Sequence, residues 1–172
     1  MSRIPTLNIE QAVESARPLL EGVQKKIGFL PNVFKTLAHA PAVLSAYMQH
    51  SAALGKTSLT AVEKETIALA TSQINGCDYC LAAHTLFASK SGMSASEIES
   101  ARYGRLDAIA ALAKKITESR GRLTDDDIAS ARAAGINDAK IIEVTAHVAA
   151  MTLTNYLNNV AQTEVDFPAI DV

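Results

Sequence analysis

Apolar residues recur at intervals of three and four along most of this chain, which is the pattern of amphipathic helices that bury one face. No segment alternates between apolar and polar residues for long enough to predict a strand. The pattern therefore predicts an all-α protein, a multi-helix bundle held together by the apolar faces. Helices are expected at residues 9–21, 32–38, 41–54, 60–74, 77–90, 95–103, 106–119, 125–133 and 138–160.

Polar residues at helix starts and glycines at helix ends divide the chain into these elements. A capping residue followed three positions later by an acidic residue or a glutamine satisfies the free amides of a helix start. Such pairs are Asn8 with Gln11, Thr60 with Glu63, Ser94 with Glu97 and Thr124 with Asp127. Glycines that follow an apolar run are expected to end helices in the left-handed conformation. They are Gly55, Gly92, Gly121 and Gly135.

The two ends of the chain differ from the rest. Residues before Asn8 and the tail from Asp166 onward are predicted to be extended arms on a single helical domain that comprises residues 1–172. We expect the apolar side chains of the arms to dock on a neighbouring subunit, because they would otherwise face water. These side chains are Ile4, Leu7, Phe167 and Ile170. The arms therefore favour a homo-oligomer.

Composition and charge exclude several classes of protein. The 172 residues include 48% apolar residues, and 16 basic against 18 acidic residues give a net charge of −2. This balance offers no electrostatic footprint for nucleic acid or for an anionic membrane surface. No apolar run approaches the roughly 20 residues of a membrane span, and the N-terminus lacks the pattern of a signal peptide. A cytoplasmic protein is expected, in which two cysteines indicate redox chemistry or a metal site.

The candidate chemistry lies around those two cysteines. Asn75 and Gly76 interrupt the helical pattern, and Cys77 opens the next helix. At 3.6 residues per turn, Cys80 and His84 lie about 60° and 20° from Cys77 around the helix axis, so the three side chains share one face. A spacing of three residues in a helix also suits the Cα separation of a disulfide.

Glu65 is expected to face His84. If Asn75 and Gly76 form the tight turn of a helical hairpin, the two helices run antiparallel about 8–10 Å apart. A residue ten positions before the turn then lies level with one about nine positions after it. The hairpin therefore predicts a chain of Glu65, His84 and Cys80 that can move a proton.

These residue types suit the reduction of a peroxide. A thiol attacks as its thiolate, and a helix N-terminus and a nearby histidine both lower its pKa. A second cysteine converts a sulfenic acid into a disulfide before further oxidation. A histidine supported by a carboxylate passes protons at neutral pH. Two other readings stay open: buried structural cysteines, and a zinc site of Cys77, Cys80 and His84 with Glu65 as the fourth ligand.

The spacing also resembles a known family. Glu65, eleven residues, Cys77-x-x-Cys80, three residues and His84 resemble the alkylhydroperoxidase AhpD-like members of the carboxymuconolactone decarboxylase superfamily. A looser resemblance to the peroxidase-related branch extends over residues 27–104. It is carried by Gly28-Phe-Leu-Pro31-Asn32-Val-Phe34 and Ala38-His39-Ala-Pro41.

The resemblance implies a fold, an activity and partners. It implies an AhpD-like helical bundle that acts as an antioxidant peroxidase on alkyl hydroperoxides, without a cofactor or metal, as a homo-oligomer, either a trimer or a hexamer. Cys80 would be the peroxidatic cysteine and Cys77 the resolving one, with Glu65 and His84 as the proton relay. The reducing equivalents would come from a dithiol protein, either lipoylated or thioredoxin-like.

This chain departs from the family at one position. Members of the family carry a histidine immediately before the second cysteine, where this chain has Tyr79. We expect Tyr79 to cover the thiols, and its hydroxyl is a candidate donor to a bound peroxide. Asn155, Asn158 and Asn159, near the end of the last helix, are candidate interface residues. The alternative functions are lactone decarboxylation and a helical redox-sensing or disulfide-exchange module without peroxidase turnover.

Overall fold

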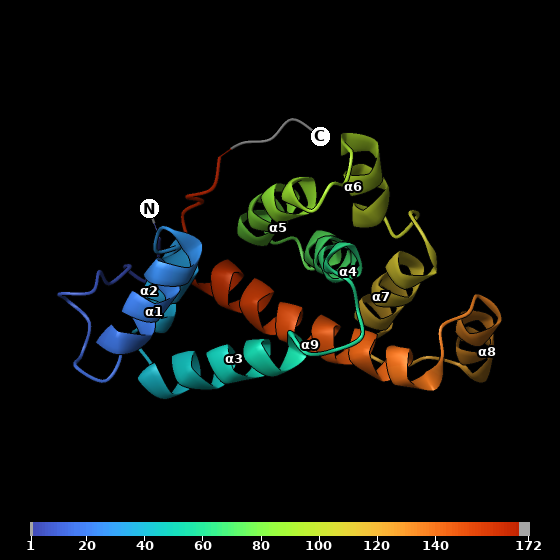
Figure 1. Ribbon diagram of the computed structural model, residues 1–172, viewed down its shortest axis with the longest axis horizontal. Helices are drawn as coiled ribbons and strands as arrows, with labels where there is room; N and C mark the ends of the chain where they lie inside the picture. Colours follow the sequence, from blue (N-terminus) through green and yellow to red (C-terminus); the bar gives the residue numbers. More distant parts are fainter. Residues whose placement is uncertain (1, 169–172) are drawn as a thin grey trace.

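The computed structural model describes residues 2–168, which form helices joined by short loops and contain no β-strand (Figure 1). The predicted all-α class is confirmed. The helices are α1 (Arg17–Ile27), α2 (Asn32–Leu37), α3 (Pro41–Leu54), α4 (Ala61–Ile74), α5 (Asp78–Lys90), α6 (Ala95–Arg102), α7 (Ala108–Ser119), α8 (Asp125–Ala133) and α9 (Asp138–Ala161). Among residues 2–168, no helix is both long enough and apolar enough to cross a membrane.

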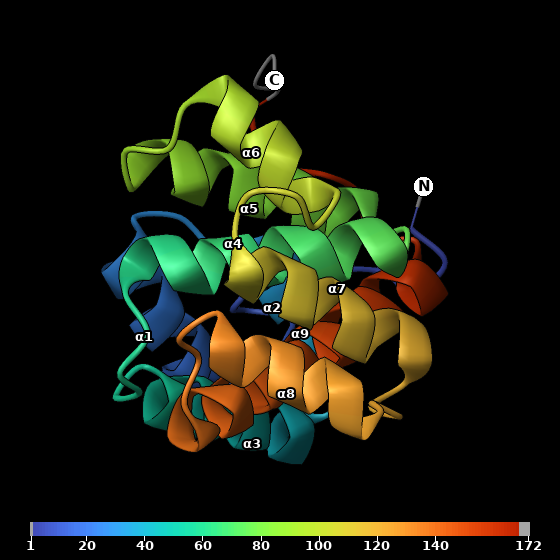
Figure 2. The same ribbon diagram turned by 90° about the vertical axis from the view of Figure 1, so that its right-hand side faces the viewer.

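Helix α4 is the centre of the bundle. It contacts α5, α6, α7 and α9, and all seven residues from 66 to 72 are buried. Figure 2 shows α4 between a layer formed by α5 and α6 and a layer that contains α3, α8 and α9. A helix that is buried all round, as α4 is in its middle, must be covered by other helices on every face. The hairpin of α4 and α5 is therefore held in the interior of the protein.

The buried face of α4 gives a direct test of this packing. We expect Ile67→Ala to lower the free energy of unfolding by about 2–5 kcal/mol, because it leaves a cavity that its neighbours fill only in part. The matched control is Ile142→Ala, since Ile67 is 0% exposed and Ile142 is 69% exposed. Denaturant unfolding measures both changes, and equal losses for the two variants would contradict this arrangement of the core.

Most predicted helix boundaries are confirmed. The pairs Thr60–Glu63, Ser94–Glu97 and Thr124–Asp127 all form reciprocal capping boxes. The predicted left-handed conformation is present at Gly92, Gly121 and Gly135 and absent at Gly55, whose φ is −58°. At Gly55 the chain continues in a right-handed turn, with Lys56 N donating to Ala53 O, so this helix ends without a left-handed residue.

The first predicted helix is wrong in its position. Residues 9–21 were expected to be helical, but α1 covers Arg17–Ile27. Asn8 and Gln11 do exchange the expected hydrogen bonds, at 3.0 and 3.1 Å, yet only a turn follows them. Pro18 explains the difference, because proline lacks an amide hydrogen and is tolerated at the start of a helix but not in its interior.

The expectation that the arms dock on another subunit is also wrong for the described residues. Arg3 N donates to Ala161 O at 2.7 Å, and Leu7 N donates to Lys35 O at 3.2 Å. Leu7 and Phe167 pack against the same apolar cluster as Cys77 and Cys80. Ile170 lies outside the described residues. The arms therefore cover their own chain and give no argument for a homo-oligomer.

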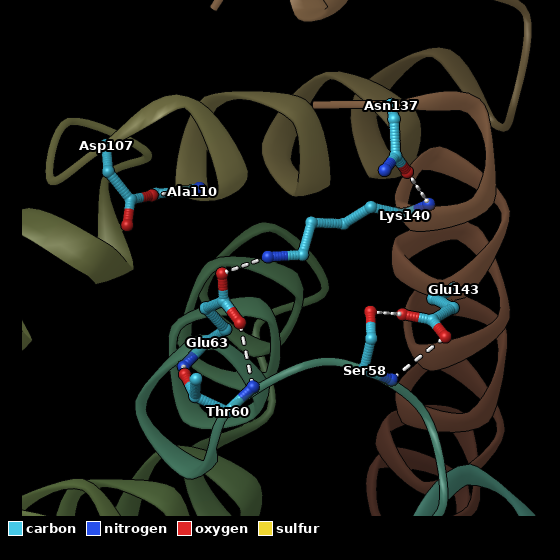
Figure 3. A network of polar contacts seen from close by, with 8 residues as sticks. All are labelled: Ser58, Thr60, Glu63, Asp107, Ala110, Asn137, Lys140 and Glu143. Carbon is cyan, nitrogen blue, oxygen red and sulfur yellow. Dashed lines mark hydrogen bonds and ion pairs between the residues drawn. The ribbon is translucent and has the colours of Figure 1, made fainter. Parts of the chain in front are cut away.

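The loop between α3 and α4 is fastened to α9 (Figure 3). Ser58 donates its amide and its hydroxyl to the carboxylate of Glu143, at 2.9 and 2.6 Å. Lys140 Nζ and Glu63 Oε1 form an ion pair at 2.6 Å. These contacts fix the first turn of α4 against α9, and Glu65 lies in the next turn.

Candidate active site

The candidate site begins at the turn between α4 and α5. Gly76 has a φ of 61°, so it allows the tight left-handed turn that reverses the chain. Cys77 is the N-cap of α5, and its sulfur accepts a hydrogen bond from Cys80 N at 3.4 Å. The turn thus brings both sulfurs to the N-terminus of α5, where the helix dipole favours a negative charge.

Glu65 and His84 meet across the hairpin, as the spacing predicts. His84 Nδ1 lies 2.7 Å from Glu65 Oε2, and the side chains are 22% and 18% exposed. The carboxylate holds Nδ1 as a donor, so Nε2 is the ring nitrogen that remains to take up or release a proton. The predicted juxtaposition of these two groups is confirmed.

Only one of the two thiols lines the cavity beside His84. Both cysteines are free and buried. Cys80 lines a cavity of about 140 Å³ together with His84, whereas Cys77 lies behind Cys80 and does not line this cavity. A molecule in the cavity would therefore meet the sulfur of Cys80 before that of Cys77.

The pKa values of the two thiols also differ, and the thiol that faces the cavity has the lower one. A hydrogen bond from the Cys77 thiol, the charge of His84 and hydrogen bonds from Asn155 and Asn158 lower the pKa of Cys80 to about 6, against the effect of burial. The hydrogen bond to Cys80, together with burial and the charge of Cys80, raises the pKa of Cys77. Cys80 is therefore the thiolate at neutral pH and Cys77 the thiol.

The surroundings of His84 favour the charged form of its ring. Burial lowers the pKa of the ring, but the charge and hydrogen bond of Glu65 and the charge of Cys80 outweigh this effect and raise it above its usual value. The charges of His84 and Cys80 thus favour each other, as in an activated cysteine.

Helix α9 contributes two buried asparagines. Asn158 Nδ2 donates to Cys80 Sγ at 3.3 Å, and its Oδ1 has no hydrogen-bond partner within the described part of the chain. Asn155 donates to Ser72 Oγ at 3.0 Å and accepts from Asn75 Nδ2 at 2.9 Å. Asn155 thereby ties α9 to the turn of the hairpin.

These asparagines, expected to line an interface, instead face the interior of their own chain. Asn159, the third of them, donates to Asn75 O at 2.9 Å. Asn158 and Asn159 lie three and four residues after Asn155, so the three amides share one face of α9, and this spacing is the signal for their role. Buried amides need hydrogen-bond partners, and here the partners are the hairpin turn and the reactive sulfur.

Tyr79 lines the cavity together with Cys80, and its hydroxyl is engaged. It donates to Asp166 Oδ1 at 2.8 Å and accepts from Val33 N at 3.2 Å. The ring packs edge-to-face on Phe167, with the centroids 5.5 Å apart. Since the single hydroxyl proton is already donated to Asp166, Tyr79 acts here as part of the cavity wall and as a fastening for the C-terminal arm.

Tyr47 of α3 lies on the opposite side of the same cavity, and sequence reasoning missed it. Its ring contacts Phe34, with the centroids 6.0 Å apart. Burial and the charge of Cys80 raise the pKa of Tyr47 to about 12. The hydroxyl therefore stays protonated and keeps a proton to donate toward the cavity.

No group of three or more His, Cys, Asp or Glu side chains among residues 2–168 is arranged to hold a metal ion. The site thus consists of two thiols, an imidazole and a carboxylate, enclosed by aromatic rings. The fold and the site together define the class of this protein. A thiolate activated by a Glu–His pair lies beside a second thiol on a buried helical hairpin.

Comparison with known proteins finds a family with a matching sequence. Residues 41–114, which contain all four of these residues, match the Carboxymuconolactone decarboxylase family. The match covers the helical hairpin and its neighbours, and the chain as a whole has the AhpD-like fold. No curated protein is significantly similar to it in sequence.

Solved structures with the same fold include two proteins described as peroxidase-related and uncharacterized. The one from Ralstonia eutropha JMP134, described as an alkylhydroperoxidase AhpD core, is 27% identical, with a TM-score of 0.84 over 96% of this chain and 92% of its own. The one from Silicibacter sp. TM1040 is 24% identical, with a TM-score of 0.78 over 94% and 88%. The debrominase Bmp8 is 20% identical, with a TM-score of 0.78 over 95% and 91%. The last two similarities concern the fold alone.

Proposed function

We propose that this protein is a thiol-dependent peroxidase that reduces organic hydroperoxides to alcohols. The observation that carries the proposal is the pairing of Cys80 and His84 in the lining of one small cavity, with Cys77 hydrogen-bonded to Cys80 and Glu65 Oε2 2.7 Å from His84 Nδ1. The lowered pKa of Cys80 supplies the nucleophile, and the raised pKa of His84 supplies a proton donor.

In the first step, the Cys80 thiolate attacks one oxygen of the peroxide ROOH. The S–O bond forms as the O–O bond breaks, so the sulfur is oxidised to a sulfenic acid and the peroxide is reduced. The departing alkoxide RO⁻ takes a proton from His84 and leaves as the alcohol ROH. Glu65 stabilises the charged ring before this transfer and keeps Nε2 as the nitrogen that gives up the proton.

In the second step, the Cys77 sulfur attacks the sulfenic sulfur of Cys80. A disulfide forms and the oxygen leaves as water, with the proton of the Cys77 thiol passing to neutral His84 and from there to the leaving hydroxide. The hydrogen bond between the two thiol groups favours this step, because it keeps the sulfurs next to each other before the reaction. A dithiol protein, lipoylated or thioredoxin-like, would then reduce the disulfide by exchange.

Thiol titration with turnover tests the proposal. Reduced protein given one equivalent of tert-butyl hydroperoxide is expected to lose both thiols and release one equivalent of alcohol. With excess dithiothreitol it should complete many cycles without a change of oligomeric state. Because the chain has 2 cysteines, the count of thiols is unambiguous.

The other functions give different results in the same assay. A redox sensor would be oxidised once and change its assembly, with few cycles under excess reductant. A lactone decarboxylase would act on its substrate after both cysteines are replaced. One structure of the debrominase Bmp8 contains 2,3,4-tribromopyrrole. Consumption of this compound at the expense of the thiols, with no hydroperoxide reduced, would reassign the thiol pair to dehalogenation. Any of these outcomes would contradict the peroxidase proposal.

A further inference from the structure

A groove of about 540 Å³ follows α3 beside the cavity of Cys80. Ile27, Phe34 and Tyr47 line both the groove and the cavity, so three side chains form a shared wall. The cavity alone, at about 140 Å³, is smaller than the usual small-molecule site of about 300–1,000 Å³, whereas the groove lies within that range. The cavity is suited to the peroxide group, and the groove to the rest of a larger substrate.

One wall of the groove is a face of α3, and the groove follows this helix. This wall consists of Tyr47, Met48, Ser51, Ala52 and Gly55. At a rise of 1.5 Å per residue, the distance along the helix from Tyr47 to Gly55 is about 12 Å. The small residues leave room over α3, and Met48 gives an adaptable apolar surface. This shape suits a single flexible hydrocarbon chain.

The charged side chains that line the groove are all positive. Lys26 and Lys56 line it, and no aspartate or glutamate does. Neither lysine forms an ion pair within residues 2–168, in contrast to Lys140, which is paired with Glu63. Two unpaired cations at the rim of an apolar groove complement a ligand with one anionic end.

We propose that the groove binds the chain of a fatty-acid hydroperoxide, with the carboxylate at Lys26 and Lys56 and the peroxide group directed past Tyr47 to Cys80. The inference deepens the proposed peroxidase function and rests on it for catalysis, but the binding itself does not require turnover. A free fatty acid fits better than a phospholipid, because the groove has space for one chain.

Substrate comparison tests the charge. The wild type is expected to have a higher kcat/KM for a mid-chain hydroperoxide of linoleic acid than for its methyl ester. Reversal of both charges in Lys26→Glu/Lys56→Glu should lower kcat/KM for the acid about tenfold, which corresponds to about 1.4 kcal/mol, and leave the ester and tert-butyl hydroperoxide unchanged. Lys25→Glu is the matched control, because Lys25 is exposed beside Lys26 and does not line the groove.

A second pair of variants tests the shape. Ala52→Phe should raise KM for the linoleate hydroperoxide and its ester without changing turnover of tert-butyl hydroperoxide. Ala53→Phe, at an exposed neighbouring position that does not line the groove, should change neither. Equal effects of the two variants, an acid and an ester with equal kcat/KM, or equal use of a phospholipid hydroperoxide would overturn the proposal.

Direct binding separates this inference from the proposed function. Calorimetry with the hydroxy fatty acid, the product of the reaction, should give saturable binding to the wild type and weaker binding to Lys26→Glu/Lys56→Glu. Binding without reduction of any hydroperoxide would contradict the peroxidase function alone. Reduction of tert-butyl hydroperoxide without binding of the hydroxy acid would contradict the groove assignment alone.

Discussion

Replacing Cys80 with serine is expected to lower the rate of hydroperoxide reduction by on the order of a thousandfold or more, because the hydroxyl has no accessible anionic form at neutral pH. The pKa of Cys80 is lowered to about 6, and no other thiol lines the cavity among the described residues. A coupled assay of peroxide consumption with dithiothreitol measures the loss.

Cys77→Ser is the informative partner of this variant. We expect it to reduce one equivalent of hydroperoxide and then stop, because the sulfenic acid at Cys80 lacks a resolving thiol. Mass spectrometry should find one added oxygen on the peptide that contains Cys80. Full multi-turnover activity of Cys80→Ser, or a sulfenic acid at Cys77, would reverse the two assignments.

Replacing Glu65 with glutamine is expected to lower kcat/KM at neutral pH by about a hundredfold, within the range for the loss of acid–base assistance. Glu65 raises the pKa of His84, and the charge of His84 lowers the pKa of Cys80. Without the carboxylate, His84 loses its proton at a lower pH, so it no longer supports the thiolate at neutral pH or protonates the leaving alkoxide.

The dependence of the reaction rate on pH shows in which direction Glu65 shifts the pKa of Cys80. The reactive thiolate is populated above the pKa of Cys80, so the wild-type rate should rise with pH through a midpoint near 6. In Glu65→Gln this midpoint should move to a higher pH. The rate of alkylation of Cys80 by iodoacetamide, followed across pH, measures the thiolate directly.

The matched control for Glu65→Gln lies two residues away on the same helix. Glu63 pairs with Lys140 and caps α4 at Thr60, with no contact to His84. Glu63→Gln is therefore expected to lower stability and to leave the midpoint of the pH profile unchanged. A profile of Glu65→Gln that coincides with the wild type would contradict the proton relay.

The helix boundaries show how far local patterns reach. Capping boxes such as that of Thr60 and Glu63 were predictable because their partners lie within one turn of each other. The pair Asn8 and Gln11 formed the same hydrogen bonds without a helix, because Pro18 sets the start of α1. A local pattern predicts a cap; whether a helix follows depends on the residues beyond it.

The meeting of Glu65 and His84 was predictable for a similar reason. A turn at Asn75 and Gly76 with two regular helices fixes the register of the hairpin, so counting residues from the turn is sufficient. The position of Tyr79 next to Cys80 also follows from the sequence. Its bond to Asp166 does not, because 87 positions separate the two residues and no local rule relates them.

The sequence by itself determined the helical class, most helix boundaries and the four side chains of the candidate site, since each of these depends on periodicity, caps or spacing within one hairpin. Only the tertiary structure decided which thiol faces the cavity and which stays behind it. It also decided that Asn158 donates to Cys80, that Tyr47 lines the cavity and that Phe167 packs on its own chain. These contacts join α3, α9 and the C-terminal arm to α5, and their geometry is set by how the helices pack around α4, which no short-range pattern encodes.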